Sequence, residues 1–213
     1  MNIKIPQAIY DKARPLLDVY YASFWNNKWK KSVILYDARG LGTMMISDIL
    51  QDTFKTTIDA FKQLNNDSKA LAVVKWTRGN IGYMGDFENN KEIEFWQYAS
   101  ETWKSKKGDC EDEAILMYKL LRNLGVPAFR LKLCAGDVVS PSNPQDLVGH
   151  CYLIYLSEQY NDWFILDGCY YPELSVQRFL KVPHRDCPEY RTIWWTFSEI
   201  GMWAQHDTLA VYE

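Results

Sequence analysis

Three residues of this chain have types and settings that suit nucleophilic chemistry: Cys110, His150 and Asp167. Cys110 follows a Gly-Asp pair and stands at the start of a segment with helical apolar periodicity. A helix N-terminus carries partial positive charge and unpaired N–H groups, which favour a thiolate over a thiol. The same N–H groups can stabilise an oxyanion. We therefore expect Cys110 to have a lowered pKa and to act as a nucleophile.

His150 and Asp167 are the natural partners of such a cysteine. His150 opens one β-rich run after a glycine-bearing loop, and Asp167 ends the next run. Adjacent antiparallel strands can bring the start of one beside the end of the other. A thiolate needs an imidazole base, and the imidazole needs an orienting acceptor. The spacing leaves the alternative open that Cys110 follows only a helix cap and that Asp167-Gly168 is only a turn.

Another interpretation of the same region is a zinc site formed by Cys110, His150 and Cys169, because Cys and His are the ligands of zinc. The chain has five cysteines and no Cys-x-x-Cys pair, so the usual spacing of zinc knuckles is absent. The remaining thiols have no chemical neighbours in the sequence, and free cysteine behaves as a small hydrophobe. We expect Cys134, Cys151, Cys169 and Cys187 to be core thiols.

The elements that must position these residues change character along the chain. Apolar residues at three- and four-residue steps predict helices over 44–64, 70–84 and 111–124. Gly125 and Pro127 should end the last of these. Beyond it, strands are predicted over 128–134, 151–156, 163–166 and 193–197, with a loop over 136–149. Helices followed by strands favour an α+β fold.

Composition excludes several classes of protein. The 213 residues carry 24 Lys+Arg against 27 Asp+Glu, so no cationic surface for nucleic acid is expected. Hydrophobic residues make up 47% of the chain and aromatic residues 15%, which is typical of a folded domain. No apolar run has the length of a membrane span, and no signal peptide is apparent. With unpaired cysteines, these features predict a cytoplasmic protein without a membrane partner.

The segments around the three chemical residues resemble the transglutaminase-like superfamily. Gly108-Asp109-Cys110-Glu111-Asp112-Glu113-Ala114 and the following helix to Ala128 resemble its nucleophile helix. Gly149-His150-Cys151-Tyr152 resembles its histidine strand, and Trp163-Phe164-Ile165-Leu166-Asp167 its Trp-x-x-x-Asp strand. Upstream residues resemble the bacterial and phage branch of transglutaminase-like cysteine peptidases, which would fit a phage-encoded origin: Trp76, Asn80, Ile81, Tyr83, Asp86, Phe95-Trp96-Gln97 and Glu101-Thr102.

The resemblance covers residues 70–170 and implies a papain-like core, in which a Cys-bearing helix packs on an antiparallel sheet. It implies Cys110 as nucleophile, His150 as general base and acid, and Asp167 as the residue that orients His150. The Cys110 N–H would be one oxyanion donor. The candidates for the second donor are upstream side chains, namely Trp76, Asn80, Tyr83 and Gln97. Some relatives bind calcium beside the nucleophile, where Asp109, Glu111 and Asp112 offer hard oxygen ligands, although capping the helix is the simpler role for them.

The sequence thus predicts a helical extension over 1–70 and a catalytic core over 71–213, within one compact domain. The predicted activity is hydrolysis of a protein or peptide amide through a thioester; no cofactor is required in this interpretation, and calcium is an option. An amine in place of water would give crosslinking, and the sequence does not decide between them. A catalytically idle module on the same fold is the main alternative. The sequence gives no oligomeric state.

Overall fold

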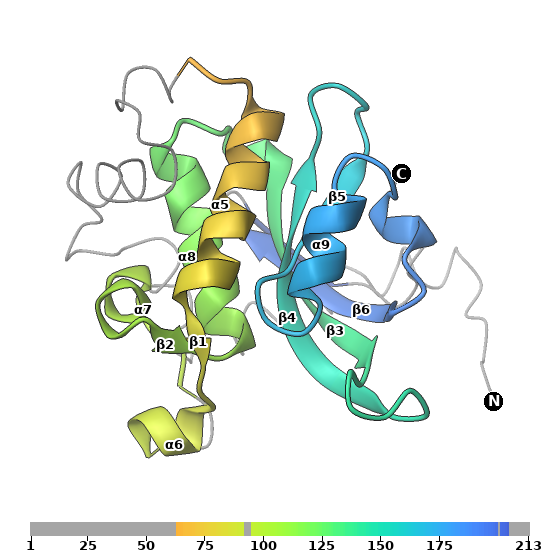
Figure 1. The fold of residues 1–213 in the computed structure, drawn as a ribbon. Helices are drawn as coiled ribbons and strands as arrows, with labels where there is room; N and C mark the ends of the chain where they lie inside the picture. The colour runs from red at the N-terminus through yellow and green to blue at the C-terminus, as the bar shows by residue number, and fades with distance from the viewer. Residues whose placement is uncertain (1–62, 92–94, 200, 205–213) are drawn as a thin grey trace.

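The computed structural model describes residues 63–91, 95–199 and 201–204, with the side chains of 201–204 excepted. Elements keep the numbering of Figure 1, in which the first described helix is α5. The predicted helix over 44–64 and most of the predicted helical extension lie outside the described residues. None of the described helices is long and apolar enough to cross a membrane.

A five-stranded antiparallel sheet supplies one layer of the fold. Its strand order is β5-β4-β3-β6-β7, so β3 lies at the centre and pairs with both β4 and β6. The strands are β3 (Leu131–Val139), β4 (Leu147–Leu156), β5 (Trp163–Leu166), β6 (Tyr190–Ser198) and β7 (Gly201–Ala204). Two short strands, β1 (Gly82–Tyr83) and β2 (Lys107–Gly108), form a separate parallel pair.

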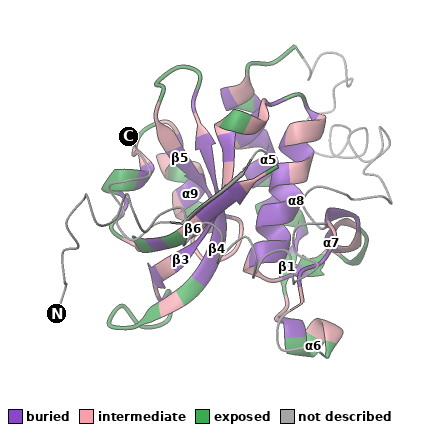
Figure 2. Cartoon of the chain, turned by 180° about the vertical axis from the view of Figure 1, so that it is seen from behind, coloured by how far each residue is buried: buried purple, intermediate pink, exposed green. Residues whose placement is uncertain are grey.

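Helices cover the sheet, and the core lies between the two layers. Helix α8 packs against β4 and β3, while α5 and α7 pack on α8, and Figure 1 shows this order. The helices are α5 (Asn66–Asn80), α6 (Asp86–Asn90), α7 (Ala99–Ser105), α8 (Cys110–Asn123) and α9 (Pro172–Arg178), with 3-10 turns η1 (Ala128–Arg130) and η2 (His184–Asp186). Buried residues concentrate along α8 and the central strands (Figure 2). The described chain is therefore α+β, as predicted.

Helix α8 begins and ends where the sequence indicates. Asp109 is its N-cap residue in an extended conformation, so Cys110 is the first helical residue. Gly125 adopts φ 86°, a left-handed conformation that glycine accepts without strain, and Pro127 follows. The buried face of the helix includes Ala114, Met117, Leu120 and Leu121. Packing of this face fixes the helix axis and so the position of its first residue.

Helix α5 begins earlier than its apolar pattern predicts. Asn65 caps it by accepting a hydrogen bond from the Ser68 N–H at 2.8 Å, so these polar residues start a helix as well as interrupting the pattern. The helix runs from residue 66 to residue 80 and so passes through residue 70, the predicted end of the extension. Asp67 is buried and accepts from Tyr155 Oη and Ser157 Oγ, which ties α5 to the end of β4.

The hairpin of β4 and β5 is confirmed, but the predicted limits of β3 and β4 were wrong. Residues 128–130 form the 3-10 turn η1, and β3 and β4 extend into the predicted loop, leaving only 140–146 between them. The extension passes through two glycines. A Cβ on Gly136 would lie 2.0 Å from the carbonyl oxygen of Thr192, so only glycine allows β6 to approach this closely.

Candidate active site

The sulfur of Cys110 lies beside strand β4. The backbone N–H of Cys151 donates a hydrogen bond to Cys110 Sγ at 3.4 Å. Pairing between β4 and β5 ends at Leu153 and Leu166, two residues short of Cys151, so β5 leaves space for the start of α8. Cys151 follows His150 directly. The first residue of the helix and the histidine strand therefore meet, although 41 residues separate the two cysteines in sequence.

His150 and Asp167 form the second part of the site. His150 Nε2 lies 2.9 Å from Asp167 Oδ2, and the two side chains are 0% and 1% exposed. His150 is in β4, and Asp167 follows the last residue of the neighbouring strand β5. The antiparallel hairpin thus brings both residues together across 17 positions of sequence. With a carboxylate at Nε2, that nitrogen carries the proton and Nδ1 is the basic atom.

Asp167 is held by four donors. Its Oδ2 accepts from His150 Nε2 and from Tyr190 Oη at 2.6 Å. Its Oδ1 accepts from the backbone N–H groups of Cys169 at 2.8 Å and Tyr170 at 3.1 Å. Burial acts to raise the pKa of this carboxyl, but the charge on His150 and these hydrogen bonds outweigh it and hold the pKa below its ordinary value. Asp167 is therefore an ionised acceptor with a fixed orientation.

The imidazole of His150 is fixed by aromatic rings. The ring of Tyr170 stacks on it with centroids 4.2 Å apart and an interplanar angle of 7°. Tyr152 lies 5.8 Å away at 20°. His150 Nδ1 is buried, and none of the residues that the structure describes forms a hydrogen bond with it. A ring that is anchored at Nε2, stacked on a neighbouring ring and unpartnered at Nδ1 retains one nitrogen for proton transfer.

Cys110 differs from the expectation of a lowered pKa. Burial and then the nearby carboxylate of Glu111 raise its pKa well above the ordinary value. Cys110 Sγ donates to Glu111 Oε2 at 3.1 Å, which stabilises the thiol rather than the thiolate. The partial charge of the helix N-terminus is outweighed because an acidic side chain lies directly beside the sulfur. In this arrangement Cys110 is held in its protonated form.

The four candidates for an oxyanion donor occupy different environments. Asn80 Nδ2 donates to the backbone oxygen of Trp76 at 2.9 Å, and Gln97 Nε2 donates to Lys107 O at 3.2 Å and to Asp112. Trp76 is buried in a stack with Trp103 at 4.7 Å.

Tyr83 differs from these three because it is 60% exposed. Burial of its hydroxyl and then the negative groups of Tyr170, Cys169, Cys110 and Asp109 raise its pKa. Its ring lies 6.5 Å from that of Tyr170, the residue stacked on His150. Among the four candidates, Tyr83 is thus the one whose ring lies beside the residue that stacks on His150.

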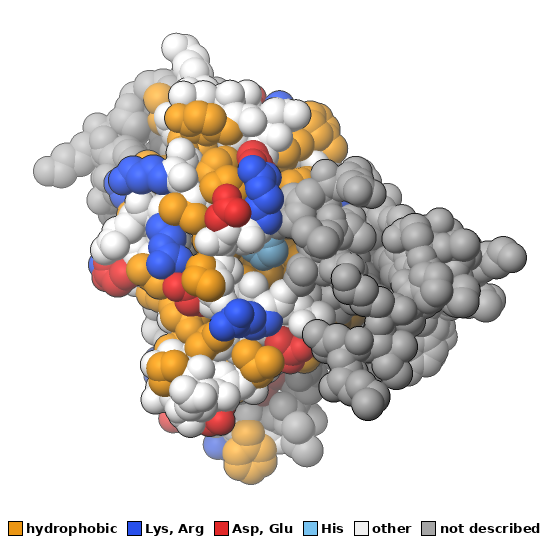
Figure 3. All heavy atoms as spheres, turned by 90° about the vertical axis from the view of Figure 1, so that its right-hand side faces the viewer, with side chains coloured by type: hydrophobic (Ala, Val, Ile, Leu, Met, Phe, Trp, Pro, Cys, Tyr) orange, Lys and Arg blue, Asp and Glu red, His pale blue; other side chains and the backbone are white. Residues whose placement is uncertain are grey.

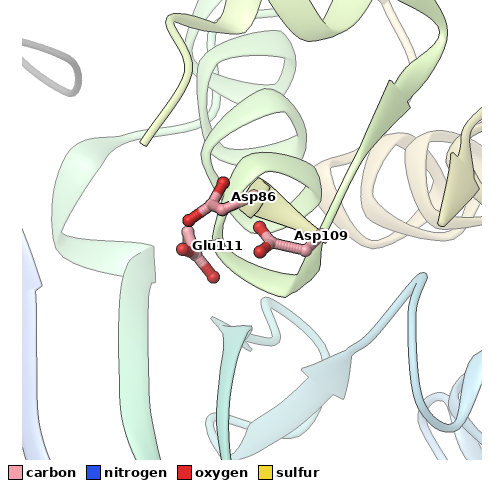
Figure 4. A group of neighbouring side chains, drawn as sticks. All are labelled: Asp86, Asp109 and Glu111. Carbon is pink, nitrogen blue, oxygen red and sulfur yellow. The ribbon is translucent and has the colours of Figure 1, made fainter. Parts of the chain in front are cut away.

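An acidic cluster lies next to Cys110. One carboxylate oxygen from each of Asp86, Asp109 and Glu111 lies within 4.8 Å of the other two. Figure 4 shows these carboxyl groups converging at the first turn of α8. Asp112 is not part of this cluster, because its Oδ1 accepts from the Gln97 N–H at 2.7 Å and its Oδ2 from the Gln97 side chain. Burial and then Asp109 raise the pKa of Asp112 to about 8.

The remaining thiols are packed within the fold. Cys134, Cys151 and Cys187 are buried, Cys169 is partly buried, and all of these cysteines are free. Within residues 63–91 and 95–199, the acidic cluster is the one group of three ligating side chains close enough to hold a metal. Cys110, His150 and Cys169 do not form such a group there. The described part of the chain therefore offers carboxylate ligands rather than a zinc-type set.

Two residues of the site were missed as functional candidates. Asp86 lies in a polar segment far before Cys110, and Tyr190 lies beyond every matched motif. The only sequence signal for Asp86 is its place in the upstream segment that carries the resemblance. Tyr190 has no local signal, because only the pairing of β6 with β3 brings it to Asp167.

A Cys-bearing helix on an antiparallel sheet that supplies His and Asp defines a transglutaminase-like fold. The sequence profile described as the transglutaminase-like superfamily matches residues 54–168, more than half of the chain. The chain belongs to this superfamily. Members are often cysteine peptidases, so membership supports an enzyme of peptidase type at this coarse level. No curated protein sequence matches the chain.

Solved structures of LapG share the fold. Calcium-bound LapG of Legionella pneumophila matches with a TM-score of 0.54 and 19% identity, over 77% of this chain and 92% of LapG. EGTA-treated LapG matches with a TM-score of 0.55 and 19% identity, over 76% of this chain and 86% of LapG. A putative cysteine protease from Cytophaga hutchinsonii, at 23% identity over 66% of this chain and 47% of its own, has a TM-score of 0.39.

Proposed function

We propose that the protein is a cysteine hydrolase that cleaves an amide bond of a protein or peptide, with Cys110, His150 and Asp167 as its triad. The observation that carries the proposal is the hydrogen bond from the Cys151 N–H to Cys110 Sγ, which brings the nucleophile to the residue next to His150. The 2.9 Å contact between His150 Nε2 and Asp167 Oδ2 also supports the proposal, because it orients the imidazole.

The roles follow from the bonding of each atom. His150 Nδ1 takes the proton of Cys110, while the Nε2 proton stays with Asp167. The thiolate attacks the amide carbonyl carbon, and the imidazolium donates its Nδ1 proton to the departing amine. A thioester remains on Cys110. His150 then takes a proton from water, whose oxygen attacks the thioester and restores the thiol.

The oxyanion formed in each attack needs donors. The Cys110 backbone N–H is unpaired within α8 because it belongs to the first residue of the helix, and it is the first donor of the proposal. We assign the Tyr83 hydroxyl as the second donor, since its ring lies 6.5 Å from that of Tyr170, which stacks on His150, and Tyr83 remains 60% exposed. A raised pKa keeps this hydroxyl protonated at neutral pH, as a donor requires.

The acidic cluster fits a calcium ion, and we include it in the proposal. Asp86, Asp109 and Glu111 provide hard oxygen ligands within 4.8 Å of one another, and calcium prefers such ligands. A bound Ca²⁺ would place positive charge beside Cys110 and would engage the Glu111 carboxylate that accepts the thiol proton. The fold likeness to a calcium-bound LapG is consistent with this choice. Asp86 takes the place that the sequence pattern gave to Asp112.

Alkylation combined with peptide cleavage tests the function. With 1 mM Ca²⁺, we expect iodoacetamide to label Cys110 at least tenfold faster than the other four thiols, as mapped by mass spectrometry. His150→Ala should slow this labelling to the rate of the other thiols. A proteome-derived peptide library should yield new N-termini with wild-type protein, and Cys110→Ser should yield none. Monodansylcadaverine in the same reaction reports amine transfer instead of hydrolysis.

The raised pKa of Cys110 and its hydrogen bond to Glu111 favour a second candidate, a catalytically idle module on the same fold. That candidate predicts slow and equal labelling of the thiols, together with no new N-termini and no incorporated amine. These results would overturn the hydrolase proposal. Fast labelling that persists in His150→Ala would instead remove His150 from the proposed role of base.

Removal of calcium should lower the reactivity of Cys110. With EGTA, the Cys110 thiol keeps its proton in the hydrogen bond to Glu111, and we expect alkylation of Cys110 to slow about tenfold, the effect of roughly one pH unit in thiol pKa. Asp86→Asn should abolish the calcium response and weaken Ca²⁺ binding by isothermal titration calorimetry. Glu88→Gln is the matched control, because Glu88 is an exposed carboxylate of the same helix outside the cluster. Unchanged binding in Asp86→Asn would place the ion elsewhere.

A further inference from the structure

The hydroxyl of Tyr190 contacts the Asp167 carboxylate. Tyr190 follows Asp167 in the sequence, whereas helix α8 precedes it. Tyr190 is the first residue of β6, and its Oη donates to Asp167 Oδ2 at 2.6 Å. The same oxygen accepts from His150 Nε2 at 2.9 Å. Two donors therefore share one carboxylate oxygen, while backbone N–H groups occupy the other.

We propose that Tyr190 is a positioning residue of the site, which fixes the Asp167 carboxylate and weakens its hold on the His150 proton by sharing Oδ2. The inference rests on the proposed function, in which His150 is the base. Tyr190 does not touch the reacting atoms. It acts through Asp167, since an oxygen that already accepts one short hydrogen bond offers less charge to a second donor.

Aromatic packing around Tyr190 holds its hydroxyl in the hydrogen bond to Asp167. The ring of Tyr190 meets Tyr152 edge-on with centroids 4.6 Å apart, and it lies 5.8 Å from Tyr171. Tyr152 in turn packs against His150. The Tyr190 hydroxyl is thereby directed at Asp167 by its neighbours. The hydroxyl of Tyr171 is occupied differently, since it donates to Val139 O at 2.6 Å.

The substitution Tyr190→Phe leaves the other titratable groups around His150 and Asp167 in place. They come from the elements packed against His150 and Asp167, namely Cys110 and Glu113 of α8, Tyr152 of β4, Cys169 and Tyr170 after β5, and His184 of η2. On β3, the residue paired with His150 is Gly136, which has no side chain. The hydroxyl of Tyr190 can therefore be removed as a single variable.

The test compares the pH titration of His150 in wild type and in Tyr190→Phe, both as the full chain. NMR of the imidazole nitrogens monitors the titration. Loss of the hydroxyl leaves Oδ2 to His150 alone, so the imidazolium is favoured and the midpoint should rise by about 0.5 to 1 pH unit. Tyr171→Phe is the matched control and should leave the midpoint unchanged, because its hydroxyl does not touch Asp167. The variant His184→Gln identifies the signals of His184, so that they are not mistaken for those of His150.

An unchanged midpoint in Tyr190→Phe would overturn the inference, as would an equal rise in Tyr171→Phe. The readout does not depend on cleavage of any peptide, so the two proposals fail separately. A raised midpoint without peptide cleavage by the wild type keeps Tyr190 as a positioning residue and removes the hydrolase. Cleavage by the wild type with unchanged titration in the variant keeps the hydrolase and removes the role of Tyr190.

Discussion

The carboxylate of Asp167 accepts four hydrogen bonds and donates none. An asparagine of the same shape cannot reproduce this pattern, because its NH₂ group is a donor. In Asp167→Asn, an amide NH₂ must replace one acceptor. The backbone N–H groups of Cys169 and Tyr170 cannot become acceptors, so the amide oxygen should face them. The NH₂ then faces His150 Nε2, which must accept. The proton of the ring moves to Nδ1, the atom required as base.

We therefore expect Asp167→Asn to fold and to lose about 10³- to 10⁴-fold in the rate of His150-dependent chemistry, as a wrong tautomer does in serine proteases. The rate of peptide cleavage at saturating Ca²⁺ measures the loss, and imidazole ¹⁵N shifts report the tautomer. Asp146→Asn is the control, because Asp146 lies in the exposed loop between β3 and β4. A near-normal rate in Asp167→Asn would show that hydrogen bonding without charge suffices, as with the Asn of papain-like enzymes.

At the residue scale, sequence reasoning reached the side chains that sit in recognisable local settings. Cys110 follows a helix cap, and His150 and Asp167 belong to one hairpin, so local patterns predicted where each would lie. The pKa of Cys110 was predicted wrongly, because burial of the sulfur raises it and because the Glu111 carboxylate, which was assigned to the helix dipole, accepts a hydrogen bond from the thiol. Asp86 and Tyr190 required tertiary contacts, which no local pattern contains.

At the scale of elements, the close approach of β6 to β3 depends on Gly136. An added Cβ would meet Thr192 O at 2.0 Å and Ile193 Cα at 3.0 Å, both of them backbone atoms that cannot move alone. We expect Gly136→Ala to lower the free energy of unfolding by about 1 to 3 kcal/mol, the usual range of an overpacked site. Urea denaturation monitored by tryptophan fluorescence measures the change.

Gly79 provides the matched control for this substitution. It lies in helix α5, and a Cβ there would have no heavy atom within 4 Å. Gly79→Ala should raise the free energy of unfolding by about 0.5 to 1 kcal/mol, because alanine loses less backbone freedom in a helix. Equal effects of the two substitutions would contradict the proposed clash at β6.

The same glycines explain why strand limits were predicted less well than strand existence. Gly136 and Gly149 lie within 136–149, where prolines, serines and glycines favour a loop, yet both residues belong to strands. A Cβ on Gly149 would lie 3.1 Å from the ring of Trp194 on β6, so glycine here permits packing between strands. By contrast, α8 was located well because its stripe and its Gly-Pro ending are both local features.

At the scale of the whole molecule, a buried neutral histidine makes stability depend on pH. Burial lowers the pKa of His184 to about 4, and its Nε2 bonds to Tyr152 Oη at 2.9 Å. The unfolded chain binds this proton near pH 6.5. The contribution of His184 is therefore complete above about pH 6.5 and is lost as the pH falls toward 4, by roughly 3 kcal/mol.

Comparison with His184→Gln isolates this contribution, since glutamine can bond to Tyr152 but does not titrate. We expect the difference in unfolding free energy between wild type and variant to change between pH 7 and pH 4, with wild type losing more. Urea midpoints at half-unit intervals of pH measure it. Parallel curves would assign the acid sensitivity to other groups.

The charged side chains on one face of the molecule are of both signs. The face shown in Figure 3 carries basic, acidic and apolar side chains intermixed, without a large area of one sign among the described residues. This distribution agrees with the net charge of -3.

The strand order has a consequence for synthesis of the protein on the ribosome. The hairpin that joins His150 to Asp167 is local, whereas β6 must emerge later and insert beside β3, on the side away from β4. A nascent chain that has not yet exposed residue 190 can pair the imidazole with the carboxylate but lacks the hydroxyl that shares Oδ2. The sheet is complete only when β6 and β7 have been added, so His150 and Asp167 acquire their final environment only after residue 190 has been synthesised and exposed.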